Sequence, residues 1–414
     1  MFINKHIAII LSLTLISIHL VAQSGTVSPY SRYGYGNLRS GGFTVSNSLG
    51  GVGYGLRSNS MINPQNPASY TAVDSLSFMF DFGASASFNQ FTSGFSQQQK
   101  STAQFDYLAL QIPIIKNMGM SLGLMPFSTV GYAYSFSETL QFNADELLTK
   151  HTFEGNGGIS RLYGGLAYAI MPQLSLGVNV NYLFGNIVHT RELTFPDNST
   201  YSSSKEESNL YVSTFLWDAG IQFIQPVGKK DVLVVGGTYT LKTPMNIRSE
   251  IVTTSTQTIT DDTNYSFDYP QSIGVGVSYK HGNSVVFAAD YSYQSFADAL
   301  FYSQRDTLLN ARRLAIGCEY VPNSTSRSYV QTIRYRLGAN IAESYTKVNE
   351  KPYSEMGITL GFGLPLKNSK SILNLNLEYG SRGIINQNLV REDYVKIGLG
   401  VSINENWFFK RKFE

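Results

Sequence analysis

The sequence of 414 residues contains little cysteine, histidine, tryptophan or charge. Charged residues make up 14% of it, whereas soluble domains contain about 25%. A single cysteine, Cys318, excludes an intramolecular disulfide, and the net charge of +2 is too small to indicate nucleic-acid binding. Beyond the N-terminus no run of eighteen apolar residues occurs, so the sequence predicts no transmembrane helix.

The scarcity of histidine also argues against an enzyme. After the N-terminal segment only His151, His189 and His281 remain, and they are not spaced as metal ligands. Neither a Ser-His-Asp arrangement nor a nucleophile elbow occurs. The glycines between Gly50 and Gly55 neither follow a strand nor open a helix, so they do not indicate a nucleotide site. We therefore expect no catalytic residue, no metal and no cofactor.

Residues 1–23 have the pattern of a secretory signal peptide. Lys5 and His6 are basic, Ile7–Leu20 is apolar, and Val21-Ala22-Gln23-Ser24 fits a cleavage zone. No cysteine follows this zone, which argues against a lipid-modified N-terminus. The sequence predicts export through a cleaved signal peptide.

A two-residue alternation of apolar and polar side chains then recurs in about fourteen segments between residues 76 and 405. Successive strand side chains point to opposite faces, so each segment forms one apolar and one polar or glycine-lined wall. Clear examples are Leu373, Leu375, Leu377 and Tyr379; Val285, Phe287, Tyr291 and Tyr293; and Met356, Ile358, Leu360 and Phe362. The pattern predicts an all-β fold, a 14-stranded antiparallel transmembrane barrel in the Gram-negative outer membrane. Cys318 falls on an apolar wall and is expected to face lipid.

The predicted connections alternate between long and short. Long ones include Glu138–Gly157, Arg191–Leu210, Thr243–Tyr269 and Ala297–Ala311, and short ones include Ile114–Gly119 and Met171–Gln173. Outer-membrane barrels carry short periplasmic turns and longer extracellular loops. A soluble β-sandwich has no reason to show this regularity.

The two ends of the mature chain differ from the barrel. Residues 24–75 are rich in glycine, serine, asparagine and proline, and they predict an N-terminal hatch that plugs the lumen. Residues 406–414 form an aromatic and basic tail, which fits either an anchor at the membrane interface or a divergent assembly signal.

Several motifs together resemble the FadL-type family of outer-membrane transporters for long-chain fatty acids and other hydrophobic compounds. They are Leu49-Gly50-Gly51-Val52-Gly53, then Asn66-Pro67-Ala68 in the hatch, Tyr269-Pro270 at the start of a strand, and Arg313–Tyr320. The resemblance implies that a hydrophobic molecule binds among the outer loops, enters a hatch-blocked lumen and leaves sideways at a kink of the third strand. The outer loops here are polar, which leaves the substrate open.

Two groups of residues are candidate sites. The third strand carries Pro126, Phe127 and Gly131, and because proline removes a ladder hydrogen bond, it marks either a lateral opening or an ordinary bulge. Arg313, Arg334 and Arg336 lie on neighbouring strands with their side chains directed inward. They form either a site for an acidic head group or part of a lumenal network of ion pairs.

The sequence therefore predicts an outer-membrane channel for passive uptake of hydrophobic or amphipathic small molecules. The alternative is a non-transporting barrel of the same fold that acts as an adaptor in secretion or surface-protein attachment. The expected partners are outer-membrane lipid and a hydrophobic small-molecule ligand, or a protein partner for the adaptor. A transporter needs a continuous apolar pocket beside the hatch, whereas the lumen of an adaptor can be filled.

Overall fold

The computed structural model describes residues 26–94, 96–142, 145–196, 201–348, 351–367, 370–383 and 390–406. The predicted signal peptide and the tail beyond Asn406 lie outside the described residues. None of the helices in the described ranges is long and apolar enough to cross a membrane.

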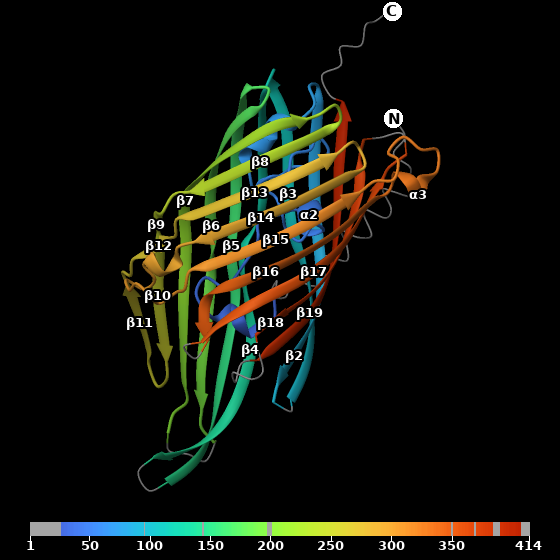
Figure 1. Cartoon of the computed structure of the whole chain (residues 1–414). Helices are drawn as coiled ribbons and strands as arrows, with labels where there is room; N and C mark the ends of the chain where they lie inside the picture. Colours follow the sequence, from blue (N-terminus) through green and yellow to red (C-terminus); the bar gives the residue numbers. More distant parts are fainter. Residues whose placement is uncertain are drawn as a thin grey trace, which may run out of the picture.

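Fourteen antiparallel strands form a closed barrel, which confirms the predicted fold class (Figure 1). Strand β19 pairs with β2 from Arg391↔Thr92 to Asn406↔Ser77 and so closes the wall. The wall consists of β2 (Ser77–Ser93), β3 (Ser96–Ile115), β4 (Met118–Phe142), β5 (Asp145–Met171), β6 (Leu174–Thr194), β7 (Ser204–Val227), β8 (Asp231–Thr240), β13 (Ser272–His281), β14 (Val285–Gln294), β15 (Ala311–Tyr320), β16 (Arg334–Val348), β17 (Lys351–Pro365), β18 (Ile372–Arg382) and β19 (Arg391–Asn406).

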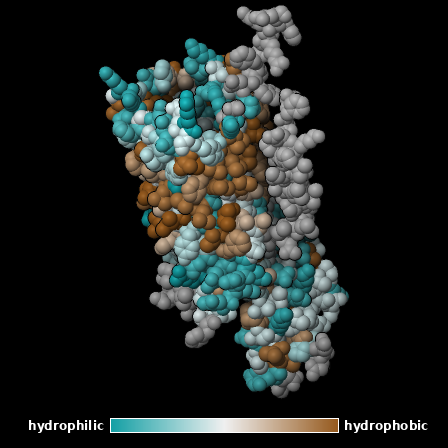
Figure 2. All heavy atoms as spheres, turned by 90° about the vertical axis from the view of Figure 1, so that its right-hand side faces the viewer, coloured by the Kyte–Doolittle hydropathy of each residue, from teal (hydrophilic) through white to brown (hydrophobic). Residues whose placement is uncertain are grey.

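The predicted alternation sets the two faces of the wall. In β18 the side chains of Leu377 and Tyr379 are 43% and 52% exposed, whereas Asn374 and Asn376 are buried on the lumenal side. The outward side chains form an apolar belt between two polar bands (Figure 2). Cys318 lies on this outer face, paired with Phe287 and Leu337 of the neighbouring strands. An apolar belt of this kind is typical of a barrel that spans a membrane.

Residues 26–75, which we call the hatch segment, lie inside the barrel (Figure 1). They contain the 3-10 helix η1 (Pro29–Arg32), the short strand β1 (Asn37–Leu38), the helix α2 (Thr44–Asn47) and the 3-10 helix η2 (Pro67–Ala72). Close approach of this segment to the wall needs glycine. A Cβ on Gly338 would lie 2.1 Å from the Gly50 nitrogen, and one on Gly177 would lie 2.5 Å from the Pro67 carbonyl carbon.

Three of the predicted outer loops are wrong, because they are largely strands. The β4–β5 ladder continues to Phe142↔Asp145 and the β6–β7 ladder to Leu193↔Ser204, so both hairpins extend far beyond the belt (Figure 1). Within 243–269 lie β9 (Thr243–Met245), β10 (Ile247–Thr254), β11 (Thr258–Thr263) and β12 (Phe267–Tyr269). β11 is exposed along almost its whole length, whereas β9, β10 and β12 are short or bury only a few residues each. No sustained apolar alternation therefore marked these segments in the sequence. The structure also contains η3 (Phe296–Asp298) and α3 (Tyr329–Thr332).

Candidate functional site

Asn66 and its neighbours fix the hatch segment near the short-turn end of the barrel. Asn66 Oδ1 accepts a hydrogen bond from the Ala68 nitrogen at 3.1 Å and so caps η2. Its Nδ2 donates to the carbonyl oxygens of Tyr54 at 2.7 Å and of Ile221 in β7 at 3.1 Å. Pro67 is buried against the strand glycines. The residues of the predicted Asn66-Pro67-Ala68 motif therefore connect the hatch segment to the wall.

A buried carboxylate holds the glycine-rich part of the hatch segment. Asp290 Oδ2 accepts hydrogen bonds from the backbone nitrogens of Gly53 at 2.5 Å and Tyr54 at 2.8 Å. Asp290 is 5% exposed, so both donors are satisfied away from water. On the other side of the hatch segment, burial lowers the pKa of Arg57 to about 10, which leaves it protonated at neutral pH. Arg57 donates to Thr71 Oγ1 at 2.8 Å.

The three arginines predicted as a head-group site do not form one free cationic cluster. Arg334 Nη1 and Arg336 Nε both donate to the Glu319 carboxylate, at 3.2 and 2.7 Å. Arg336 Nη1 also donates to Asn374 Oδ1 at 2.8 Å. Arg313 instead donates to hatch carbonyl oxygens. In the structure these side chains take part in ion pairs and hydrogen bonds of the lumen, and a head-group site at them stays a prediction.

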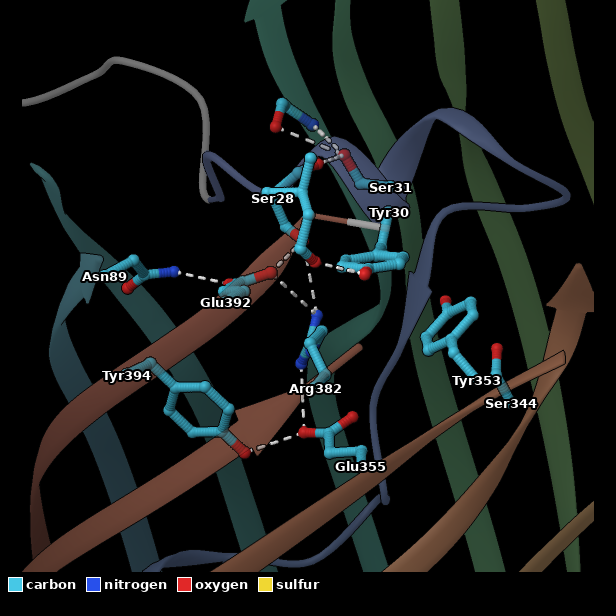
Figure 3. Close-up of polar contacts among 12 residues, drawn as sticks. Ser28, Tyr30, Ser31, Asn89, Ser344, Tyr353, Glu355, Arg382, Glu392 and Tyr394 are labelled. Carbon is cyan, nitrogen blue, oxygen red and sulfur yellow. Dashed lines mark hydrogen bonds and ion pairs between the residues drawn. The ribbon is translucent and has the colours of Figure 1, made fainter. Parts of the chain in front are cut away.

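A second polar network joins the start of the hatch segment to β17, β18 and β19 (Figure 3). Ser28 Oγ donates to Glu392 Oε2 at 2.5 Å, and Asn89 Nδ2 donates to the other oxygen of Glu392 at 2.8 Å. Arg382 Nη2 and the Tyr394 hydroxyl both donate to Glu355 Oε1, at 3.0 and 2.7 Å. The hatch segment is thus bonded to the wall at both of its ends.

The wall has a gap between its second and third strands. The β3–β4 ladder runs only from Ile115↔Met118 to Leu108↔Leu124. Beyond it no ladder joins the described residues 96–107 of β3 to residues 125–142 of β4, although β3 stays paired with β2 and β4 with β5. Pro126 lies at the start of this gap, where the β4–β5 register also shifts. The register shift in β4 and the end of the β3–β4 ladder therefore coincide at Pro126, and lateral passage at this place stays a prediction.

Phe127 and Gly131 follow Pro126 along the gap. The Phe127 ring packs against Tyr269, with centroids 5.9 Å apart. Ser31 Oγ donates to the Gly131 carbonyl oxygen at 3.1 Å and accepts from its nitrogen at 3.0 Å. The hatch segment therefore covers the first part of the gap.

A polar cavity of about 340 Å³ extends from the lumen to the gap. On the gap side it is lined by Arg39, Gln104, Asp106 and Pro126, and across the lumen by Glu355 and Arg382. Arg39 Nη1 lies 3.5 Å from Asp106 Oδ1. Charged and amide side chains of this kind suit water or a polar group and are poorly suited to an acyl chain.

The apolar side chains of the outer lumen are packed against one another. Five aromatic residues are all less than 9% exposed and belong to one buried cluster: Tyr35 of the hatch segment, Phe267 of β12, Phe296 of η3, Phe301 and Tyr345 of β16. Tyr35 and Phe301 meet edge to face with centroids 5.1 Å apart, and Phe296 lies 4.6 Å from Tyr345. Aromatic rings at these distances are in direct contact, so these side chains occupy part of the outer lumen.

Sequence reasoning missed several residues of this site. Glu355, Arg382 and Glu392 could have been identified, because strict alternation in β17, β18 and β19 directs them inward. Arg39 and Ser31 carried no such signal, since they lie in the hatch segment outside any repeating pattern.

Solved structures with the same fold include toluene transporters, a monoaromatic hydrocarbon channel and a FadL homologue. The toluene transporter TbuX of Ralstonia pickettii has a TM-score of 0.59 at 13% identity, over 88% of this chain and 98% of that chain. A Pseudomonas aeruginosa FadL homologue gives the same values. The Pseudomonas putida toluene transporter TodX has a TM-score of 0.57 at 13% identity, over 90% of this chain and 99% of that chain. The predicted resemblance to the FadL type is thus confirmed for the fold.

No protein of curated function matches the sequence. The family model described as BamG matches residues 2–414, nearly the whole length, and the chain therefore belongs to the BamG family.

Proposed function

We propose that this protein is an outer-membrane adaptor, a non-transporting barrel that engages a protein partner in secretion or surface-protein attachment. The observation that carries the proposal is the aromatic cluster packed in the outer lumen. A transporter of apolar molecules has to present apolar side chains to an open pocket. Here Tyr35, Phe267, Phe296 and Phe301 are buried against one another instead.

The attachment of the hatch segment supports the same proposal. Asp290, Arg313, Glu392 and Asn66 each bond it to the wall at a different place. A hydrogen bond to a charged group contributes about 1.5–3 kcal/mol, so moving the whole segment out of the lumen would cost several such bonds at once. A hatch held in this way suits a rigid support better than a gate.

The outer surface carries exposed strands that a protein partner could contact. The β4–β5 and β6–β7 hairpins and the β10–β11 pair extend the sheet beyond the belt. A sheet raised above the membrane provides backbone edges and side chains to another polypeptide. Export of the protein would follow from the predicted signal peptide.

Passage of an amphipathic small molecule is the second candidate, and the gap between β3 and β4 is the observation that favours it. The polar cavity reaches this gap, and the fold is shared with transporters of toluene. The cavity lining by Arg39 and Asp106 suits a polar head group, so the hypothesis concerns amphipathic rather than purely apolar molecules.

Native mass spectrometry with lipid extraction separates the two functions. The full-length protein is purified in mild detergent from its own outer membrane. A stoichiometric protein partner without an apolar ligand supports the adaptor. A stoichiometric acyl or other apolar ligand, with the barrel free of partners, would overturn it in favour of transport.

A further inference from the structure

Strand β4 has an unpaired edge beyond the membrane belt. Its last pair with β3 is Leu108↔Leu124, and from Met125 onward only β5 forms a long ladder with it. The two-residue strand β1 covers the edge at Ser128 and Thr129. The part of β4 that continues outward has no such cover in the described residues.

The contacts of the hatch segment reveal which backbone groups point to this edge. The Arg39 nitrogen donates to the Phe127 carbonyl oxygen at 3.0 Å, and Gly131 exchanges two hydrogen bonds with Ser31 Oγ. Odd-numbered residues therefore direct their N–H and C=O groups to the edge, because these groups alternate sides along a strand. Glu138 agrees, since its carbonyl oxygen faces β5 and accepts from Thr149 Oγ1 at 2.9 Å.

We call residues 133–141 of β4 the free edge. By this alternation its edge-facing groups belong to Ala133, Ser135, Ser137, Thr139 and Gln141. All five residues are exposed, and within the described chain no backbone partner reaches them from that side. The free edge contains no proline and no lysine, which natural proteins place on edges to prevent pairing.

Exposed aromatic side chains lie beside the free edge on one face of the sheet. Tyr134 and Phe136 are 37% and 48% exposed. The Tyr134 ring stacks on Phe153 at 5.3 Å, and Phe136 stacks on His151 at 5.0 Å. Exposed aromatic residues next to an open edge are common features of sites that bind an extended peptide.

We propose that the free edge binds an extended segment of a partner polypeptide by strand addition, with alternate apolar side chains of that segment over Tyr134 and Phe136. The hatch segment supports this proposal, because its strand β1 already pairs with the same edge of β4 at Ser128 and Thr129. The inference rests on the proposed adaptor function and names the place and form of the contact.

Two other occupants fit the free edge less well. The first alternative is the outer part of β3 itself, which carries Gln97, Gln98, Gln99 and Lys100. If it paired with the free edge, it would place polar side chains beside Tyr134 and Phe136. In a second copy in the same membrane β4 would run in the same direction. Two copies related by a two-fold axis along the membrane normal would have their sheets facing opposite ways. The aromatic side chains of the two copies would then lie on opposite faces of the joined sheet and could not contact one another.

The test uses a pair of substitutions at edge-facing positions. In the Ser135→Pro/Ser137→Pro variant two edge N–H groups are lost, while the even-numbered N–H groups that pair with β5 remain. The matched control, Ser135→Thr/Ser137→Thr, keeps every N–H group. We expect the proline variant to lower recovery of the partner roughly tenfold or more and the control to leave it unchanged. Equal recovery with both variants, each verified as a folded barrel, would overturn the proposal.

Hydrogen exchange at single-residue resolution gives an independent readout on the native protein in its outer membrane. Strand addition slows exchange at the odd-numbered amides 133–141, and slow exchange ends when the partner is removed. Photo-crosslinking from position 135 then identifies the occupant. Cross-links to another polypeptide support the proposal, whereas cross-links confined to residues 96–107 or to a second copy, or fast exchange throughout, overturn it. If a partner co-purifies but the free edge stays unprotected, the docking place is wrong and the adaptor function stands; if no partner co-purifies, the adaptor function itself fails.

Discussion

Arg313 of β15 donates from Nη2 to the carbonyl oxygen of Gly50 at 2.8 Å. A cation that could have bound an acidic head group is therefore used to hold the hatch segment against the wall. The same guanidinium contacts Gly51, where a Cβ would lie 2.3 Å from Nη2. Glycine at position 51 is needed both for this contact and for its φ of +87°.

Replacing Arg313 with methionine should loosen the hatch segment. The Gly50 carbonyl loses its charged donor, which costs about 1–3 kcal/mol for a buried group. We expect faster cleavage of residues 26–75 in limited proteolysis of the detergent-solubilised protein and a lower thermal midpoint. The control is Arg312→Met, which removes an exposed arginine whose Nη1 lies 3.6 Å from the equally exposed Glu343. An exposed pair contributes little, so a similar loss in both variants would contradict the role of Arg313.

Local patterns such as strand alternation could be predicted from the sequence, whereas long-range contacts such as that of Arg313 could not. Alternation such as Leu373 to Tyr379 is local, so it predicted the strand number and the outward face correctly. The partner of Arg313 lies more than 260 positions away in the chain, and no local pattern specifies it. The strand β10 was missed because only Ile247 and Ser249 of it are buried and its other residues are mostly polar, so it lacks a sustained apolar alternation, as does the exposed β11. Pro126 did mark the gap, since a proline within a closed barrel wall needs a break in pairing.

Gly338 of β16 should not tolerate a side chain. A Cβ there would lie 2.1 Å from the Gly50 nitrogen and 2.2 Å from the Leu49 carbonyl carbon, and backbone atoms cannot move aside as a side chain can. We expect Gly338→Ala to displace the hatch segment and to increase its proteolysis. Gly164→Ala is the control, because its Cβ would meet only Leu122 Cδ1 at 3.8 Å. An intact hatch segment in the Gly338 variant would show that the close approach is not essential.

Pro126→Val separates the adaptor from the second candidate. Valine restores a backbone N–H at the start of the gap and favours continued strand pairing. Under the adaptor proposal partner recovery stays unchanged, since the free edge begins beyond Gly131. Uptake of a fluorescent fatty acid by cells carrying the protein is measured in parallel. A fall in uptake with unchanged partner recovery would favour lateral passage through the gap.

Replacing Glu319 should lower stability more than replacing other lumenal carboxylates, because Glu319 forms ion pairs with both Arg334 and Arg336. Arg336 is 3% exposed, so Glu319→Gln leaves its buried cation without a counter-charge. Breaking a buried pair in this way costs about 3 kcal/mol, which should lower the urea midpoint of unfolding in lipid vesicles. The double variant Glu319→Gln/Arg336→Met removes the orphaned cation as well, and we expect it to recover most of the loss. Because Arg334 is more exposed, Arg334→Met alone should have a small effect. If the double variant is as unstable as Glu319→Gln, the penalty does not come from the unpaired Arg336 and the lumenal network has to be assigned differently.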